Sequence, residues 1–188
     1  MSARGSKSGT ILTAAFRLRW CVPILATLER QEGAKFVSLC HELEAHQTAV
    51  RDAIDHLIGV GWVRRNSGYG HPLRPEYLLT ARGQRLAPAC SRIDTILTSM
   101  NLRDIGLRRW SVPVLGTVAN LNPARFGSIG QSLGNITAKA LSSALKDLSA
   151  TTLIERHVLE GFPPRTEYRA ASRADRLVLA IDQLHTAA

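Results

Sequence analysis

Two stretches of the sequence place hydrogen-bonding side chains on one face of a helical repeat. In residues 137–146 the apolar residues recur at helical spacing, which leaves small, hydroxyl and lysine side chains on the opposite face. In residues 47–55 the same spacing leaves glutamine, threonine and arginine together with two aspartates. Lysine and arginine bind phosphate and guanine, glutamine pairs with adenine, and hydroxyls bind base edges or phosphates. The chemistry open to both stretches is therefore recognition of a nucleic acid.

The two faces offer different sets of candidate contact residues. Those on the first face are Gln47, Thr48 and Arg51, and those on the second are Thr137, Ala138, Lys139, Ser142, Ser143 and Lys146. The first face also carries Asp52 and Asp55, which repel phosphates unless they are paired. Arg51 stands four residues before Asp55, at the spacing of a helical ion pair. We therefore expect the two stretches to read DNA unequally, and a merely solvated face is the alternative for each.

Further cations flank both stretches in segments that are typical of β-hairpins. They are Arg64, Arg65, Arg74, Arg156 and Arg165, with His71 and His157 nearby. Short strand-like runs in these segments are separated by glycine and proline, as hairpin strands are by their loops. The arginines suit phosphate because the planar guanidinium donates two hydrogen bonds at once. For Arg74 and Arg165 the alternative is a structural ion pair with Glu76 or Glu167.

The two stretches belong to a repeat with a spacing of about 90 residues. Residues 19–25 (RWCVPIL) return as residues 109–115 (RWSVPVL), and residues 72–77 (PLRPEY) return as residues 163–168 (PPRTEY). The order and the spacing of the shared residues are both kept, so chance is a poor explanation. Two copies of so long a period do not make a solenoid, and two globular units are the better interpretation.

Each copy predicts a helix with the Arg-Trp segment, a second helix, a turn, a third helix, a β-hairpin and a last helix. The second helices are expected at residues 36–43 and 126–133. Thr48 and Thr137 are the expected N-caps of the third helices, and Thr80 and Ser172 those of the last helices. The hairpin strands are expected at residues 62–65 with 76–79 and at residues 153–156 with 167–168, with loops at residues 66–73 and 157–164.

This series of elements is that of a winged helix. The predicted fold class is mainly α with small β-hairpin wings (α+β), arranged as two tandem winged helix-turn-helix domains. The expected divisions are a flexible arm at residues 1–8, a first domain at residues 9–98 and a second at residues 99–188. In such a unit the third helix lies in the major groove while the wing reaches a phosphate strand or the minor groove. The aromatic residues at matched positions are assigned to the core rather than to base stacking, namely Trp20, Trp110, Tyr77 and Tyr168.

The charge balance favours a polyanionic partner. The 188 residues include 24 Lys and Arg against 15 Asp and Glu, which gives a net charge of +9 and an isoelectric point near 10.3. The excess is shared, with +5 before Ser99 and +4 from there on. A basic tail on a neutral domain would look different. A solvated basic surface without a partner is the alternative.

Several other classes of protein find no support in the sequence. Three widely spaced cysteines, Cys21, Cys40 and Cys90, argue against a secreted disulfide scaffold, and neither a leader nor a membrane-spanning run stands out, so a cytoplasmic, nucleoid-associated protein is expected. Cys40, His41 and His46 make the one metal-like cluster, and it lacks a fourth ligand. The motifs of phosphate-binding loops, zinc proteases and serine hydrolases are absent. We therefore expect no enzyme, no metal site and no cofactor.

Both units resemble HxlR-type regulators, a branch of the MarR-like winged-helix transcription factors. The resemblance rests on the early Arg-Trp, a Lys/Arg-Phe pair at residues 35–36 and 125–126, the segment 136–148 (ITAKALSSALKDL), the motif Pro-x-Arg-x-Glu-Tyr and residues 79–83 (LTARG). Such proteins usually carry one unit and dimerise through their terminal helices, so two units in one chain imply a covalent pseudo-dimer. Several of them sense oxidants or aldehydes through an N-terminal cysteine. Residues 1–18 contain none and Cys21 lies on an expected core face, so redox sensing is not carried over.

The residues and the resemblance together imply a sequence-specific transcriptional regulator that binds double-stranded DNA. It would act as a pseudo-dimer, monomeric or paired again as a homodimer, with another regulator or RNA polymerase as a further partner. Two alternatives stay open. One is a tandem winged-helix adaptor that binds proteins, against which the basic charge counts, and the other is an architectural DNA-binding protein of low sequence specificity. The operator and the sign of regulation do not follow from the sequence.

Overall fold

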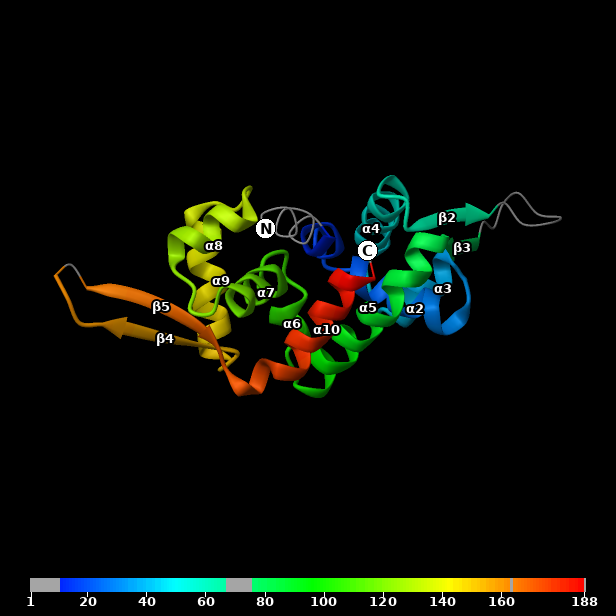
Figure 1. The fold of residues 1–188 in the computed structure, drawn as a ribbon. Coiled ribbons are helices and arrows are strands. Elements are labelled where there is room, and N and C mark those ends of the chain that lie inside the picture. Colours follow the sequence, from blue (N-terminus) through cyan, green and yellow to red (C-terminus); the bar gives the residue numbers. More distant parts are fainter. Residues whose placement is uncertain (1–10, 67–75, 163, 188) are drawn as a thin grey trace.

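The computed structural model describes residues 11–66, 76–162 and 164–187. The expected N-terminal arm and part of the first hairpin, including His71 and Arg74, lie outside these residues. The described residues are mainly helical with small antiparallel sheets, which confirms the predicted class. Figure 1 shows an elongated molecule with a hairpin at each end and with α5 (Ala81–Ser99) and α10 (Asp175–Thr186) between them.

The first half of the chain begins with a helical segment at residues 11–15. The elements that follow are α2 (Cys21–Gln31), β1 (Ala34–Lys35), α3 (Phe36–Glu42), α4 (Gln47–Gly59), β2 (Val63–Asn66), β3 (Glu76–Leu79) and α5. Pro23 stands in the first turn of α2, where its missing N–H costs no helical hydrogen bond. The predicted second and third helices of this half are both present.

The second half repeats this order. Its elements are α6 (Arg103–Gly106), α7 (Ser111–Leu121), α8 (Phe126–Leu133), α9 (Ala138–Ala150), β4 (Ile154–Leu159), β5 (Arg165–Ala170), the 3-10 turn η1 (Ser172–Ala174) and α10. In the first half the strands pair in the order β1-β3-β2, with Ala34 opposite Tyr77. In the second half β4 pairs with β5, and Ala124 forms a bridge to Tyr168 with backbone N–O distances of 2.9 and 2.8 Å. The same alanine–tyrosine pairing therefore ties the hairpin to the chain ahead of the second helix in both halves.

Two of the four expected helix caps are confirmed and two are wrong. The hydroxyl of Thr80 accepts a hydrogen bond from the Gly83 N–H at 3.1 Å, and that of Thr137 accepts one from the Ala140 N–H at 3.2 Å. Thr48 lies inside α4, because that helix already begins at Gln47. Ser172 opens the 3-10 turn instead, and α10 begins only at Asp175, whose carboxylate in the first turn suits the helix dipole.

The second hairpin is longer than predicted. Its strands pair from Ile154 opposite Ala170 out to Leu159 opposite Arg165, so residues 157–159 belong to a strand and not to a loop. The burial pattern explains the error. Beyond Ile154 both faces of β4 are exposed, and the side chains then lack the in–out alternation that marks a half-buried strand.

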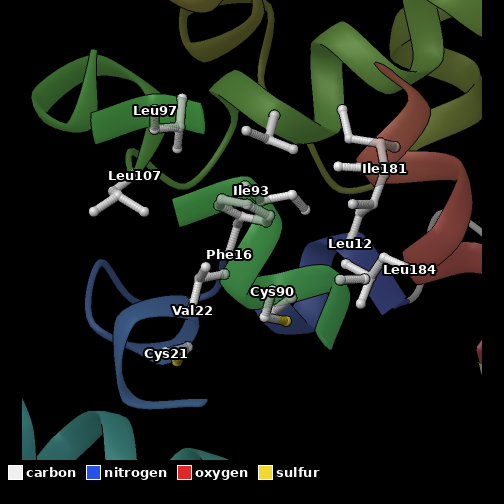
Figure 2. Close-up of a cluster of buried hydrophobic side chains, with 14 of the residues drawn as sticks. Leu12, Phe16, Cys21, Val22, Cys90, Ile93, Leu97, Leu107, Ile181 and Leu184 are labelled. Carbon is white, nitrogen blue, oxygen red and sulfur yellow. The ribbon is translucent and has the colours of Figure 1, made fainter. Parts of the chain in front are cut away.

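One continuous hydrophobic core joins the two halves. Figure 2 shows side chains from both, including Leu12, Phe16 and Ile93 of the first half and Leu107, Ile181 and Leu184 of the second. A Cβ atom on Gly116 of α7 would come within 3.1 Å of both Leu12 and Ile181, so the N-terminal helical segment packs where α7 meets α10. Tyr77 is buried, and Trp20, Trp110 and Tyr168 pack against this core, as predicted for these four aromatic residues. Trp62 is buried as well.

The cysteines of the core are held as neutral thiols. Cys21 and Cys90 are fully buried, which confirms the expected core position of Cys21. Burial raises the pKa of Cys21 to about 12, and it raises the pKa of Cys90 as well. Because the thiolate is the reactive form, neither side chain has the environment of a reactive cysteine. Across the described helices, none is long and apolar enough to cross a membrane.

Candidate nucleic-acid interface

Helix α9 presents a clean division between a buried and an exposed face. Its buried face consists of Leu141, Ala144, Leu145 and Leu148. All six residues predicted for the opposite face are exposed, namely Thr137, Ala138, Lys139, Ser142, Ser143 and Lys146. The spacing of the leucines thus fixes which side chains the helix offers to a partner. The alanine and serine side chains are short, so the backbone of α9 can approach a groove closely.

The exposed face of α9 keeps its positive charge. Neither Lys139 nor Lys146 takes part in an ion pair with another described residue. The one carboxylate of the helix, Asp147, is half-buried and accepts a hydrogen bond from the guanidinium of Arg108 at 2.7 Å. The negative charge of Asp147 is therefore compensated by an arginine of the protein itself. Thr137 uses its hydroxyl as the helix cap and leaves the remaining polar groups of this face available.

Helix α4 has a different electrostatic character. Gln47, Thr48 and Arg51 are exposed as predicted, and so are Asp52 and Asp55. The expected pair of Arg51 with Asp55 is wrong: no ion pair of the described residues joins them. The Arg51 guanidinium lies over the Phe36 ring instead, 4.7 Å from its centre.

A cation–π contact explains this choice, because the planar guanidinium covers the partly exposed ring while it stays in contact with water. The contact ties Arg51 of α4 to Phe36 of α3. It leaves both aspartates of α4 without a compensating charge among the residues described. Helix α4 is therefore a less favourable surface for phosphates than α9.

The hairpins carry the other predicted cations. Arg64 and Arg65 are exposed on β2, and Arg156 and Arg165 are exposed on β4 and β5. The guanidinium of Arg156 donates a weak hydrogen bond of 3.4 Å across the hairpin to Thr166. His157 lies 3.2 Å from Glu155 on the same strand.

The suggested ion pair of Glu167 with Arg165 is wrong. Glu167 is nearly buried where the hairpin joins the body, and Arg125 reaches it at 3.2 Å from the position just before α8. Arg165 lies two residues further out along β5, and it makes no ion pair with another described residue. In the first half Lys35 and Glu76 occupy the matching positions and are cross-strand neighbours in β1 and β3. The arginine of the Lys/Arg-Phe pair thus fastens the second hairpin, whereas no ion pair of the described residues joins Lys35 to Glu76.

Sequence reasoning missed an apolar group at the end of the second hairpin. Val158 and Leu159 are 55% and 41% exposed, and Phe162 is fully exposed. They lie between Arg156 and Arg165, with Glu160 as the carboxylate among them. Three large apolar residues within the five residues 158–162, next to Pro163 and Pro164, were the available signal, because segments with such turn residues are usually polar. The described residues contain no group of three or more side chains suited to hold a metal ion.

Comparison with known proteins agrees with this geometry. Residues 105–188 match a family described as HxlR-like helix-turn-helix. An uncharacterized HTH-type transcriptional regulator of Halalkalibacterium halodurans is 33% identical over 76 residues, which are 40% of this chain and 67% of the relative. A second, from Methanothermobacter thermautotrophicus, is 30% identical over 76 residues, which are 40% of this chain and 57% of the relative. The chain therefore belongs to the HxlR-like helix-turn-helix family.

Proposed function

We propose that the protein is a sequence-specific transcriptional regulator that binds double-stranded DNA as a covalent pseudo-dimer. The observation that carries this proposal is the exposed face of α9, where two lysines that make no ion pair with another described residue stand among short hydroxyl and methyl side chains. Membership in a helix-turn-helix family and the names of the two relatives support regulation of transcription. In this function α4 and α9 lie in the major groove, as the third helices of winged-helix units do.

The pseudo-dimer rests on the repeat within the chain. We propose that the chain divides into tandem winged-helix units at residues 9–98 and 99–188. Among the described residues, each half has three helices, a pair of hairpin strands and a last helix in the same order, namely α2, α3, α4, β2, β3 and α5 in the first and α7, α8, α9, β4, β5 and α10 in the second. The last helices of the two units, α5 and α10, lie against each other, and the N-terminal helical segment packs on the second half at Gly116. Joined terminal helices are the arrangement expected when two such units pair. A single chain then sets the distance between α4 and α9.

In this proposal the two units contribute unequally to DNA recognition. In a homodimer every change in one recognition helix is imposed on the other, and the target is palindromic. A fused pair lacks that constraint. The clean basic face of α9 supports base and phosphate contacts, whereas Asp52 and Asp55 weaken those of α4. We therefore propose an asymmetric target, with the second unit as the principal reader.

The wings add contacts of two kinds. Arg64, Arg65 and Arg156 suit phosphates, because they are exposed and make no ion pair with another described residue. The second wing also ends in the exposed Phe162, and apolar side chains of this kind contact deoxyribose or wedge between base steps in the minor groove. We propose that Phe162 makes such a contact.

Binding to genomic fragments across a salt series tests the proposal. A specific regulator keeps an excess of roughly 4–10 kcal/mol for its site over random sequence, while both affinities fall with salt. An architectural protein would show the same salt dependence and little site preference. A protein-binding adaptor would bind no fragment at low salt. Either of the last two results would overturn the proposed function.

A further inference from the structure

We propose that a cavity between α5 and α10 binds a small organic anion with an apolar body. The cavity has a volume of about 340 Å³ and is lined by Ser91, Arg92, Thr95, Ile96, Arg176, Leu179, Ala180 and Gln183. This volume falls at the lower end of the range of small-molecule sites, roughly 300–1,000 Å³. The lining comes from the last helix of each half, and on α10 it runs from the exposed Arg176 and Leu179 to the buried Ala180.

The charge of the lining selects an anion. Arg92 and Arg176 both face the cavity, and no carboxylate lines it. The Arg92 guanidinium donates a hydrogen bond of 2.5 Å to the side-chain carbonyl of Gln183, which fixes its position across the two helices. Arg176 has neither a hydrogen bond nor an ion pair from its side chain to any residue that the structure describes. Two guanidinium groups in one lining, with no ion pair from either to another described residue, favour a bound carboxylate or similar acid, which a guanidinium binds with two hydrogen bonds.

The apolar part of the lining selects the body of the ligand. Leu179 is 61% exposed, although its neighbours Ile96 and Ala180 are buried. A large apolar side chain beside two cations gives the cavity one charged and one apolar wall. Apolar walls with a few placed polar groups are the usual composition of sites for small molecules. A flat hydrocarbon or aromatic body would cover Leu179 while its acid group meets the arginines.

The position of the cavity gives the ligand a means of acting on the rest of the protein. It bridges α5 and α10, and the contact between these helices joins the two halves of the chain. A ligand that binds one arrangement of the helices more tightly shifts the protein toward that arrangement. This inference goes beyond DNA binding, and occupation of the cavity does not depend on it.

Isothermal titration calorimetry of the full chain without DNA tests the proposal. The probe is naphthalene-2-carboxylate, and its uncharged amide is the comparison ligand. We expect the carboxylate to bind one molecule per chain with a Kd on the order of 0.01–1 mM, as suits a ligand of this size. The amide should bind at least tenfold more weakly.

Three variants locate the site. Arg176→Gln and Arg92→Gln should each weaken the carboxylate at least tenfold. Arg85→Gln is the matched control, because Arg85 holds the position on α5 that Arg176 holds on α10 and does not line the cavity. It should change the Kd less than twofold. Far-ultraviolet circular dichroism and the thermal midpoint should be the same for all three, since these guanidinium groups lie at the surface.

Three results would overturn the proposal. The first is no binding of the carboxylate at 5 mM, and the second is binding of the amide as tight as that of the carboxylate. The third is an equal loss of affinity for the carboxylate in Arg85→Gln and Arg176→Gln. The competing occupant is a second copy of the chain seated on Leu179. Light scattering that shows a dimer, broken by Leu179→Ser, together with no binding of the probe, would assign the surface to that copy instead. DNA binding is measured separately, so a failure here leaves the proposed function untouched.

Discussion

The guanidinium of Arg51 lies 4.7 Å from the centre of the Phe36 ring. The residue best suited to read guanine from α4 is thus held against the neighbouring helix α3, and it does not neutralise Asp55. On α9 the situation is reversed, because Arg108 compensates Asp147 and the two lysines stay unpaired among the described residues. These two contacts give a similar pair of helices exposed faces of different charge, which is the basis of the proposal that they bind DNA unequally.

Removing the carboxylates of α4 should strengthen DNA binding. The double variant Asp52→Asn with Asp55→Asn removes two negative charges that face the phosphates in the proposed complex. We expect the affinity for a bound genomic fragment to rise about three- to tenfold at low salt and the gain to shrink as salt is added. Fluorescence anisotropy at several salt concentrations measures both the affinity and its dependence on salt. Asp182→Asn on the exposed side of α10 is the control and should have no effect. An unchanged affinity in the double variant would place α4 away from the DNA.

The tip of the second wing should contribute without charge. Phe162→Ala is expected to lower the affinity for DNA about three- to tenfold with no change in its salt dependence, because the side chain is apolar. Arg156→Gln should lower the affinity and also reduce the slope of log Kd against log salt by about one phosphate contact. Comparing the slopes of log Kd against log salt for the two variants separates an apolar contact of Phe162 from a phosphate contact of Arg156. If Phe162→Ala binds DNA as the parent does, the wing tip lies clear of the duplex.

The shared core should make the two halves unfold together. Leu12 is buried where the N-terminal helical segment meets α7 and α10. Leu12→Ala should lower the free energy of unfolding by about 2–4 kcal/mol, the usual cost of such a truncation in a core. Val37→Ala, at a position that is 75% exposed, should cost less than about 0.5 kcal/mol. Urea unfolding followed by circular dichroism and by tryptophan fluorescence should give coincident transitions in all three proteins. Two separate transitions would show that the halves are independent.

The thiols should differ in reactivity as their burial differs. Burial raises the pKa of Cys21 to about 12, so at pH 8 its thiol is protonated as well as covered. Burial also raises the pKa of Cys40, which is only half-buried. Iodoacetamide at pH 8 should therefore modify Cys40 slowly and leave Cys21 and Cys90 intact until urea unfolds the chain. Mass spectrometry of the peptides gives the rates. Rapid native modification of Cys21 would contradict the buried position.

The elements that local pattern controls were predictable from the sequence. The leucines of α9 and the apolar residues of α4 recur every three or four positions, and this spacing alone identified the exposed faces. Thr137 was predictable as a cap because its partner is only three residues away. The repeat fixed the order of the remaining elements.

The contacts that set the character of the site were not predictable in the same way. Arg125 and Glu167 are 42 residues apart, and only the fold brings them together. Arg51 had two possible partners, an aspartate one turn away and a ring on another helix, and local spacing favoured the wrong one. The outer second hairpin was mistaken for a loop because both of its faces are exposed.

The central claim is that the second recognition helix is the principal reader of DNA. It is tested most directly by measuring the affinity of Lys139→Glu and Arg51→Glu for the same bound fragment by fluorescence anisotropy at one salt concentration. Each variant makes the same change of charge on an exposed helix face, so the two are matched. We predict a loss at least tenfold greater for Lys139→Glu than for Arg51→Glu. Equal losses, or a greater loss for Arg51→Glu, would contradict the account.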